Sequence, residues 1–167
     1  MNELNHVAFI MDGNGRWGKK NGQGRNFGHF KGVETVKKIV KGSIKSKIKI
    51  VSFYVFSSEN WKRPKAEINY LFKLITNYFA KEIESIIKQG IKINILGEVD
   101  KLSSNVKSIL KKTILLTKKN EKIIVNLAIN YGSKNEILNA VKKNKKKLIL
   151  KILKKIFTPK VFQIQIF

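Results

Sequence analysis

Hydrophobic positions along the chain fall into alternating strand-like and helix-like segments. Near-continuous apolar or β-branched runs predict four strands, at Val7–Met11, Ile48–Phe56, Ile91–Leu96 and Ile123–Ile129. Apolar residues at helical spacing predict helices between and after them, around Lys31–Lys41, Ala66–Lys88, Asn105–Leu116 and Asn135–Val141. This alternation indicates an α/β fold with a mostly parallel sheet flanked by helices on both faces.

Polar loops follow these predicted strands. The first is Asp12-Gly13-Asn14-Gly15-Arg16-Trp17, with Arg25 and Gly28-His29 downstream, and the second is Ser57–Pro64. A turn, Asn130-Tyr131-Gly132, follows the fourth strand. Ligands of parallel sheets bind beyond the carboxyl ends of the strands, so we expect these segments to share one edge.

The residue types of the first loop suit a diphosphate. Glycines let the backbone approach a ligand, and Arg16 and Arg25 offer charge-assisted, bidentate contacts to phosphate oxygens. Asp12, at the end of the strand, suits a hard cation such as Mg²⁺. The loop matches neither the P-loop nor the dinucleotide-binding pattern. The alternative is a glycine-rich turn in which Asp12 caps a helix.

The second loop gathers two hydroxyls, a carboxylate, an amide, an indole and a guanidinium, in Ser57, Ser58, Glu59, Asn60, Trp61 and Arg63. The alternative here is a capped loop in which Trp61 fills the core. Pro64 is expected in the first turn of the next helix, and Glu67 suits the positive end of that helix. Since two polar loops converge on one edge, a binding site is the favoured interpretation.

Composition adds bounds on the function. The 167 residues predict one domain, and the absence of cysteine excludes disulfides and thiolate chemistry. The net charge of +24 favours anionic partners, but Lys, Ile and Asn are all in excess, so AT-rich codons account for much of it. No nucleic-acid-binding motif accompanies the charge, and nucleic acid is not an expected partner. No signal peptide or membrane-spanning run is found, which predicts a cytoplasmic protein.

Three motifs resemble those of the cis-prenyltransferases, specifically the bacterial undecaprenyl diphosphate synthases. The first is Met11–Trp17 with Arg25 and Gly28-His29, and the second is Phe56–Pro64. The third is Asn130-Tyr131-Gly132, where Ser133 replaces the glycine of the family pattern. The resemblance covers residues 6 to about 141. Prenyl synthases of the trans type use Asp-rich pairs on helices. This chain has only two aspartates, Asp12 and Asp100, so the trans class is excluded.

The resemblance implies condensation of an allylic diphosphate, such as farnesyl diphosphate, with isopentenyl diphosphate to give a polyprenyl diphosphate carrier for cell-wall synthesis. It implies that Asp12 is catalytic and binds Mg²⁺, and that Asn60 is catalytic, matching the residue proposed to accept the proton in the family. Because a neutral amide is a poor base, we expect Asn60 to orient groups while pyrophosphate or water takes the proton. The residues implied to bind substrate are Gly13, Asn14, Gly15, Arg16, Trp17, Arg25, His29, Ser57, Ser58, Glu59, Trp61 and Arg63. An apolar channel is expected between the sheet and the helices following strands two and three.

The resemblance further implies a homodimer. We expect residues 1–141 to form an incomplete cis-prenyltransferase domain that lacks its last strands, and residues 142–167 to form a basic Lys/Ile-rich tail. Lys142–Phe157 predicts a basic amphipathic helix suited to peripheral contact with the anionic inner face of the membrane. The favoured alternative is a solvated helix of the incomplete domain. The codons of Phe162–Phe167, shifted by two bases, can read Pro-Asp-Pro-Asp-Phe, which suggests a reading-frame slip. The alternative function is a truncated, catalytically impaired relative that only binds allylic diphosphate.

Overall fold

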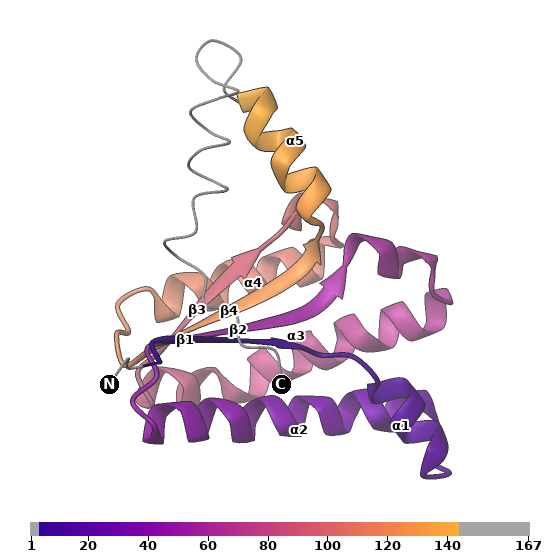
Figure 1. The fold of residues 1–167 in the computed structure, drawn as a ribbon, viewed down its shortest axis with the longest axis horizontal. Coiled ribbons are helices and arrows are strands. Elements are labelled where there is room, and N and C mark those ends of the chain that lie inside the picture. Colours follow the sequence, from indigo (N-terminus) through magenta and orange to yellow (C-terminus); the bar gives the residue numbers. More distant parts are fainter. Residues whose placement is uncertain (1–3, 144–167) are drawn as a thin grey trace.

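The computed structural model describes residues 4–143 (Figure 1). Four strands form the sheet: β1 (His6–Ile10), β2 (Ile50–Ser57), β3 (Ile91–Leu96) and β4 (Ile123–Tyr131). Five α-helices accompany them: α1 (Asn14–Lys20), α2 (Gly24–Lys45), α3 (Lys65–Lys88), α4 (Ser104–Thr117) and α5 (Ser133–Lys143). Two short 3₁₀ helices are η1 (Ser58–Lys62) and η2 (Val99–Lys101). All four strands fall where the apolar runs predict them, within three residues at each end.

The sheet is parallel throughout, in the order β1-β2-β4-β3. Its inward side chains include Val51, Phe53 and Ile129, which are 0–1% exposed and form the centre of the core. In Figure 1, α2 and α3 lie on one side of the sheet and α5 rises on the other. The α/β fold with a parallel sheet is therefore confirmed.

Helix α4 and the segment after it lie along the outer edge of β3 and satisfy backbone groups there. Thr117 Oγ1 accepts the Ile93 N–H at 3.2 Å, and Asn120 Nδ2 donates to the Ile91 carbonyl at 2.8 Å. An unpaired strand edge is a site for unwanted pairing with other chains. These two contacts satisfy one N–H and one carbonyl of the β3 edge from within the chain.

The region after β1 differs from the prediction. The sequence predicts a glycine-rich loop followed by a helix around Lys31–Lys41, whereas residues 14–20 form α1 and α2 already begins at Gly24. The reason is close packing of two glycine-bearing helices: a Cβ on Gly28 would lie 1.8 Å from the Asn14 carbonyl oxygen, and one on Gly18 would lie 2.2 Å from the Gly24 carbonyl oxygen. Backbone contact between α1 and α2 overrides the low helix propensity of glycine.

Candidate active site

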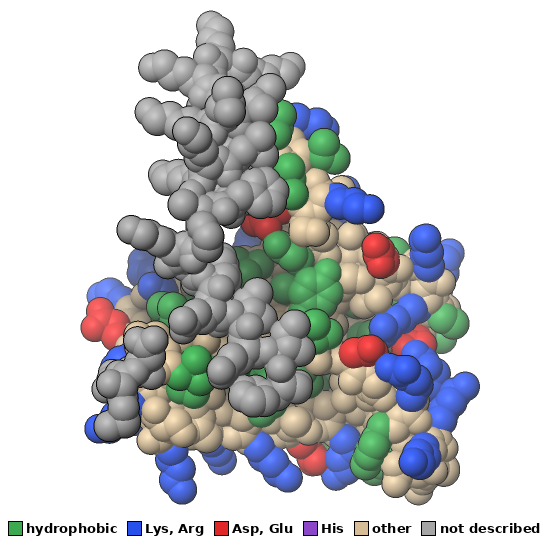
Figure 2. Space-filling model, in the orientation of Figure 1, with side chains coloured by type: hydrophobic (Ala, Val, Ile, Leu, Met, Phe, Trp, Pro, Cys, Tyr) green, Lys and Arg blue, Asp and Glu red, His purple; other side chains and the backbone are tan. Residues whose placement is uncertain are grey.

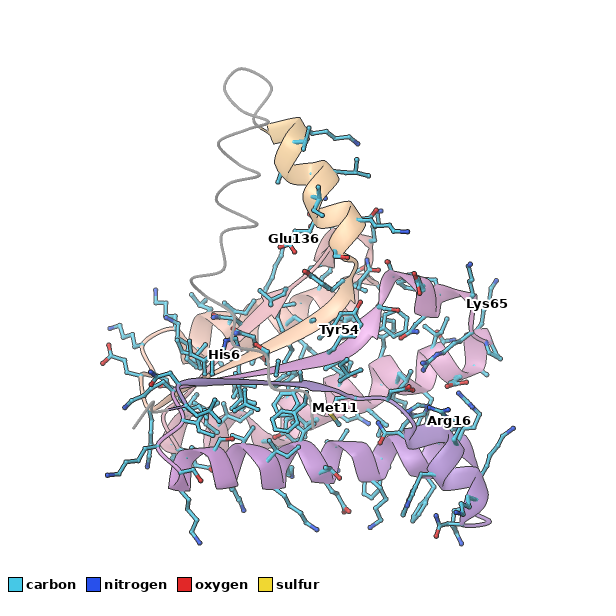
Figure 3. The ribbon with its side chains drawn as sticks, viewed as in Figure 1. His6, Met11, Arg16, Tyr54, Lys65 and Glu136 are labelled. Carbon is cyan, nitrogen blue, oxygen red and sulfur yellow. The ribbon has the colours of Figure 1, made fainter. Side chains whose placement is uncertain are left out.

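The chain leaves β1 through Met11 and turns at Gly13, whose φ is 81° and therefore favours glycine. The Gly13 N–H donates to Asp12 Oδ1 at 2.6 Å, and Arg16 Nη2 donates to Asp12 Oδ2 at 3.1 Å. The Asp12 and Arg16 side chains are 69% and 77% exposed. An ion pair this exposed is weak, so both groups can exchange partners at little cost. Figure 3 shows Met11 and Arg16 at the end of the sheet where β1 leads into α1.

The second loop begins at Ser57, the last residue of β2, and continues through η1. The Ser57 N–H donates to Asn60 Oδ1 at 3.1 Å, which holds the amide side chain of Asn60 against the start of η1. Trp61 Nε1 donates to Asn130 Oδ1 at 2.7 Å and packs edge-on against Phe56, with ring centroids 5.3 Å apart. The indole therefore joins the second loop to the end of β4. Pro64 immediately precedes α3 instead of lying in its first turn.

A buried carboxylate connects the two loops. Glu67, in the first turn of α3, is 8% exposed and accepts two hydrogen bonds from Arg25, from Nε to Oε2 at 2.9 Å and from Nη2 to Oε1 at 2.8 Å. His29 Nε2 lies 3.0 Å from the same Oε1, and Arg63 Nη1 lies 3.5 Å from it. Glu67 thus contacts Arg25 and His29, which follow β1, and Arg63, which follows β2.

These contacts fix the charge states. Hydrogen bonding from Arg25, against the opposing effect of burial, lowers the pKa of Glu67 to about 2. Burial lowers the pKa of His29, which outweighs the opposing effect of Glu67. The hydrogen bond to Glu67 raises the pKa of Arg25. At neutral pH the cluster therefore holds two guanidinium cations, one carboxylate and a neutral imidazole.

A cavity of about 180 Å³ opens between the loops, and its lining is strongly cationic. It is lined by Met11, Asp12, Gly13, Asn14, Gly15, Arg16, Arg25, His29 and Arg63. A second cavity of about 310 Å³ shares Asp12, Asn14, His29 and Arg63 with it and adds Ser57 and Asn60. The two loops after β1 and β2 therefore do meet at one edge of the sheet.

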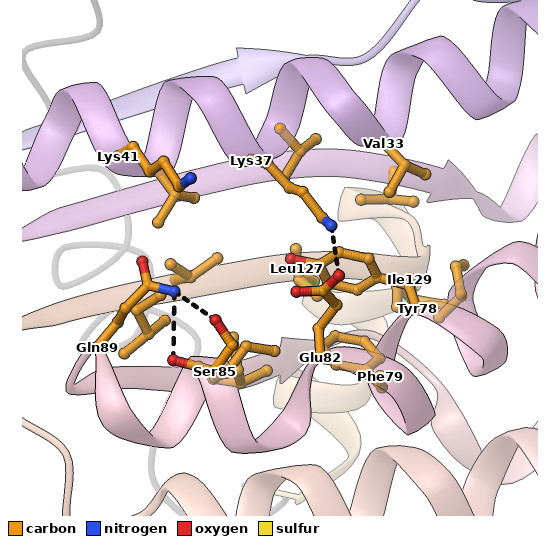
Figure 4. Close-up of a pocket in the computed structure, with 18 residues that line it drawn as sticks. Val33, Lys37, Lys41, Tyr78, Phe79, Glu82, Ser85, Gln89, Leu127 and Ile129 are labelled. Carbon is orange, nitrogen blue, oxygen red and sulfur yellow. Dashed lines mark hydrogen bonds and ion pairs between the residues drawn. The ribbon is translucent and has the colours of Figure 1, made fainter.

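An apolar cavity continues from the second one between α2, α3 and the sheet (Figure 4). Both are lined by Val33, Val36, Val55 and Ile75, so they are contiguous. The polar side chains of this third cavity lie along the facing flanks of α2 and α3, where Lys37 Nζ and Glu82 Oε1 are 2.6 Å apart. An apolar cavity therefore lies between the sheet and α3, where the channel was expected, but its second wall is α2 and no residue of α4 lines it. The expectation that the helix after β3 forms this wall was wrong, because α4 contacts α3 at a separate groove that Trp61 also lines.

The other expected site residues lie outside these cavities. Trp17 is 48% exposed and stacks on Phe27, with ring centroids 6.0 Å apart. Ser58 lies against the backbone of Gly132, where a Cβ would be 2.4 Å from its Oγ. Glu59 is exposed on η1, and Trp61 lines a separate groove between α3 and the start of α4.

Two residues were missed by the sequence analysis. Glu67 was assigned only to the helix end, although its position four residues after Arg63 is a spacing that favours ion pairs. Asn130 was assigned to a turn, but it lies within β4, is 3% exposed and has a φ of 52°. Its Nδ2 donates to the Glu98 carbonyl at 2.8 Å. No local sequence pattern reports that contact.

Positive charge is not confined to the cavity. Figure 2 shows Lys and Arg side chains along α2 and around α1, with a few acidic groups among them. Among residues 4–143, no helix is both long and apolar enough to cross a membrane.

Comparison with known proteins identifies relatives of this chain. The Prenyltransf family model, which describes undecaprenyl diphosphate synthase, matches residues 10–166. An isoprenyl transferase of Clostridium tetani is 44% identical over 137 residues, which are 82% of this chain and 54% of the relative. An isoprenyl transferase of Bacillus thuringiensis subsp. konkukian is 41% identical over 136 residues, 81% of this chain and 53% of the relative. The chain thus spans about half the length of these curated relatives.

Solved structures agree with this assignment. The lavandulyl diphosphate synthase of Lavandula x intermedia, solved with dimethylallyl diphosphate, superposes with a TM-score of 0.82 at 25% identity, over 94% of this chain and 66% of that one. A Campylobacter jejuni protein described as a probable undecaprenyl diphosphate synthase has a TM-score of 0.74 at 32% identity, over 93% of this chain and 69% of that one. Sequence motifs, fold and relatives converge, and the chain belongs to the undecaprenyl diphosphate synthase family of prenyltransferases.

Proposed function

We propose that this chain binds an allylic diphosphate and transfers its prenyl group to isopentenyl diphosphate. The observation that carries the proposal is the continuity of a cationic cavity with an apolar one. An allylic diphosphate has the matching shape, with a highly charged head and a branched hydrocarbon tail. The head fits against Arg16, Arg25 and Arg63, and the tail extends between α2 and α3.

The arginines act on the charge that develops as the allylic C–O bond breaks. Arg25 keeps three N–H groups besides those bonded to Glu67, and Arg16 is paired with the exposed Asp12. Guanidinium groups beside the diphosphate stabilise the negative charge that develops on it as it departs. Asn60 has its amide oxygen engaged by the Ser57 N–H, so we assign it an orienting role and not that of a base.

Magnesium fits the donor set at this cavity. Asp12 offers an exposed carboxylate beside the arginines, and Mg²⁺ in proteins is commonly held by one or two carboxylates together with substrate phosphates. Asp12 would hold the ion, and the ion would neutralise charge on the leaving diphosphate. Release of Arg16 from Asp12 then leaves its guanidinium for the phosphate oxygens.

Other parts of the proposal follow from the family. We propose a polyprenyl diphosphate product of the cell-wall carrier type, a homodimeric state, and a cytoplasmic protein in peripheral contact with membrane. The segment expected to touch the membrane, Lys142–Phe157, lies outside the described residues except for its first two positions. The domain division after residue 141 remains a prediction, and so does the reading-frame slip at Phe162–Phe167, which lies outside the described residues.

Calorimetry with farnesyl diphosphate and Mg²⁺ tests allylic binding directly. The wild-type chain should bind, and Arg25→Ala and Asp12→Ala should each lose on the order of tenfold or more in affinity, because charge-assisted contacts to phosphate are lost. Lys45→Ala, an exposed site at the far end of α2, is the charge-matched control and should bind like wild type. Equal affinity of all four proteins would contradict the proposal.

Incorporation of radiolabelled isopentenyl diphosphate, measured separately, tests the transfer step. Binding without incorporation would favour the alternative of a relative that only binds allylic diphosphate. Incorporation lost in Asp12→Ala but retained in Lys45→Ala would support the enzyme.

A further inference from the structure

Glu67 presents a problem for a site that binds anions. Its carboxylate is 8% exposed and lies within hydrogen-bond distance of three residues that line the cationic cavity, Arg25, His29 and Arg63. A buried negative charge beside a diphosphate site weakens binding by Coulomb repulsion. The chain places one there nonetheless, so its contribution to the site must come from geometry.

The geometry at Arg25 is constrained from two sides. Glu67 engages Nε and Nη2 in a bidentate pair, with distances of 2.9 and 2.8 Å, which fixes the plane of the guanidinium. On the other side, the backbone of Gly15 packs against the same group, since a Cβ there would lie 2.9 Å from Arg25 Cζ. The guanidinium is therefore clamped between the carboxylate of α3 and the backbone of α1.

The same carboxylate also sets the state of His29. An ionised carboxylate only accepts hydrogen bonds, so the 3.0 Å contact with Oε1 requires a proton on His29 Nε2. A neutral imidazole with its proton on Nε2 has an unprotonated Nδ1. Glu67 thereby selects one tautomer of a buried histidine that lines the cavity.

We propose that Glu67 is a positioning residue that orients Arg25 and fixes the Nε2–H tautomer of His29 for recognition of the diphosphate. This inference rests on the proposed function and adds to it a residue that contacts no substrate. The proposal predicts the direction in which affinity changes. If Glu67 positions Arg25 and His29, removing its negative charge should weaken the binding of an anion. If Glu67 acted only through its charge, removing that charge would strengthen the binding.

The test measures the affinity of wild type, Glu67→Gln and Glu67→Asp for inorganic pyrophosphate with Mg²⁺. Glu67→Gln should bind on the order of 10–100-fold more weakly, as loss of a supporting partner typically costs. Glu67→Asp keeps the charge on a shorter side chain and should recover part of the affinity. Glu34→Gln, which removes a carboxylate from a surface ion pair with Lys31 on α2, is the matched control and should leave affinity unchanged. Pyrophosphate bound by Glu67→Gln as tightly as by wild type, or more tightly, would overturn the inference.

Nitrogen-15 NMR of the histidine rings gives a readout independent of binding. Wild type should show His29 as the Nε2–H tautomer at neutral pH, and Glu67→Leu, which has no hydrogen-bond acceptor, should show a mixture or the Nδ1–H form. An unchanged His29 signal in Glu67→Leu would also overturn the inference. If the wild-type chain binds no pyrophosphate, the proposed function fails, while the NMR comparison still decides the role of Glu67. Should Glu67→Leu fail to fold, the same spectrum is taken on Glu67→Asp, where a longer contact to His29 should admit the second tautomer.

Discussion

The packing of α1 on α2 gives the sharpest prediction, the effect of Gly28→Ala. The new Cβ would lie 1.8 Å from the Asn14 carbonyl oxygen and 2.7 Å from its carbonyl carbon. Ordinary contact begins at 3.4 Å, so the helices must separate locally by about 1.6 Å. Both atoms belong to the backbone, and no rotamer change relieves the overlap. Overpacking of this kind costs ~1–3 kcal/mol, and we expect a value near the upper end.

The same displacement should reach the site. Asn14 and Gly15 line the cationic cavity, and Gly15 packs on Arg25, so a shift of α1 moves the residues that face the diphosphate. Misplacement by ~1 Å can cost about 100-fold in a positioned site. Gly28→Ala should therefore lower both the midpoint of urea unfolding and the affinity for farnesyl diphosphate.

The control lies on the same helix. Gly42 is exposed, and a Cβ there would meet nothing within 4 Å. Gly42→Ala should stabilise the protein by ~0.5–1 kcal/mol through helix propensity and leave affinity unchanged. If the two variants unfold at the same urea concentration, or if Gly28→Ala binds as wild type does, backbone contact between α1 and α2 does not position the site.

Two further predictions concern buried polar groups. Thr117→Val removes the only hydroxyl bonded to the Ile93 N–H among the described residues, and the unsatisfied amide should lower the free energy of unfolding in urea by ~1–3 kcal/mol. The control Thr35→Val, at an exposed helix position, should change stability little. Equal effects of the two variants would refute the role of Thr117 at the β3 edge. The folded-state pKa of Glu67 is about 2 against an ordinary 4.5, so its stabilisation is complete above pH 4.5 and is lost as pH falls toward 2. Urea unfolding at pH 6, 4 and 3 should show a steeper loss for wild type than for Glu67→Gln, and parallel losses would contradict the ionised buried carboxylate.

The strands were predictable because their apolar runs are continuous, as buried parallel strands require. Helix α1 was not, because Gly15 and Gly18 lower helix propensity and no apolar period marks the segment. For the same reason the start of α2 was placed seven residues too late, since its periodicity begins only around Val33. In both cases tertiary contact between backbones, which no local pattern encodes, decides the structure.

Some residues of the candidate site could be predicted from the sequence, and Glu67 could not. Asp12, Arg16, Arg25 and Arg63 were singled out because few side chains can bind phosphate or Mg²⁺, and the topology of a parallel sheet brings their loops together. Glu67 escaped notice because a glutamate in the first turn of a helix has a ready explanation in the helix dipole. Only the structure shows that it faces Arg25, 42 residues earlier in the chain.

Asn130, near the end of β4, connects the second loop to the sheet. Its amide accepts from Trp61 Nε1 at 2.7 Å and donates to the Glu98 carbonyl at 2.8 Å, so one side chain joins η1 to the segment after β3. Aspartate cannot donate in this way, and leucine can do neither. Asparagine also tolerates a positive φ, here 52°, better than most residues. The second loop is therefore anchored through Trp61 to the sheet itself, which leaves Asn60 and Arg63 on either side of the indole to face the cavity.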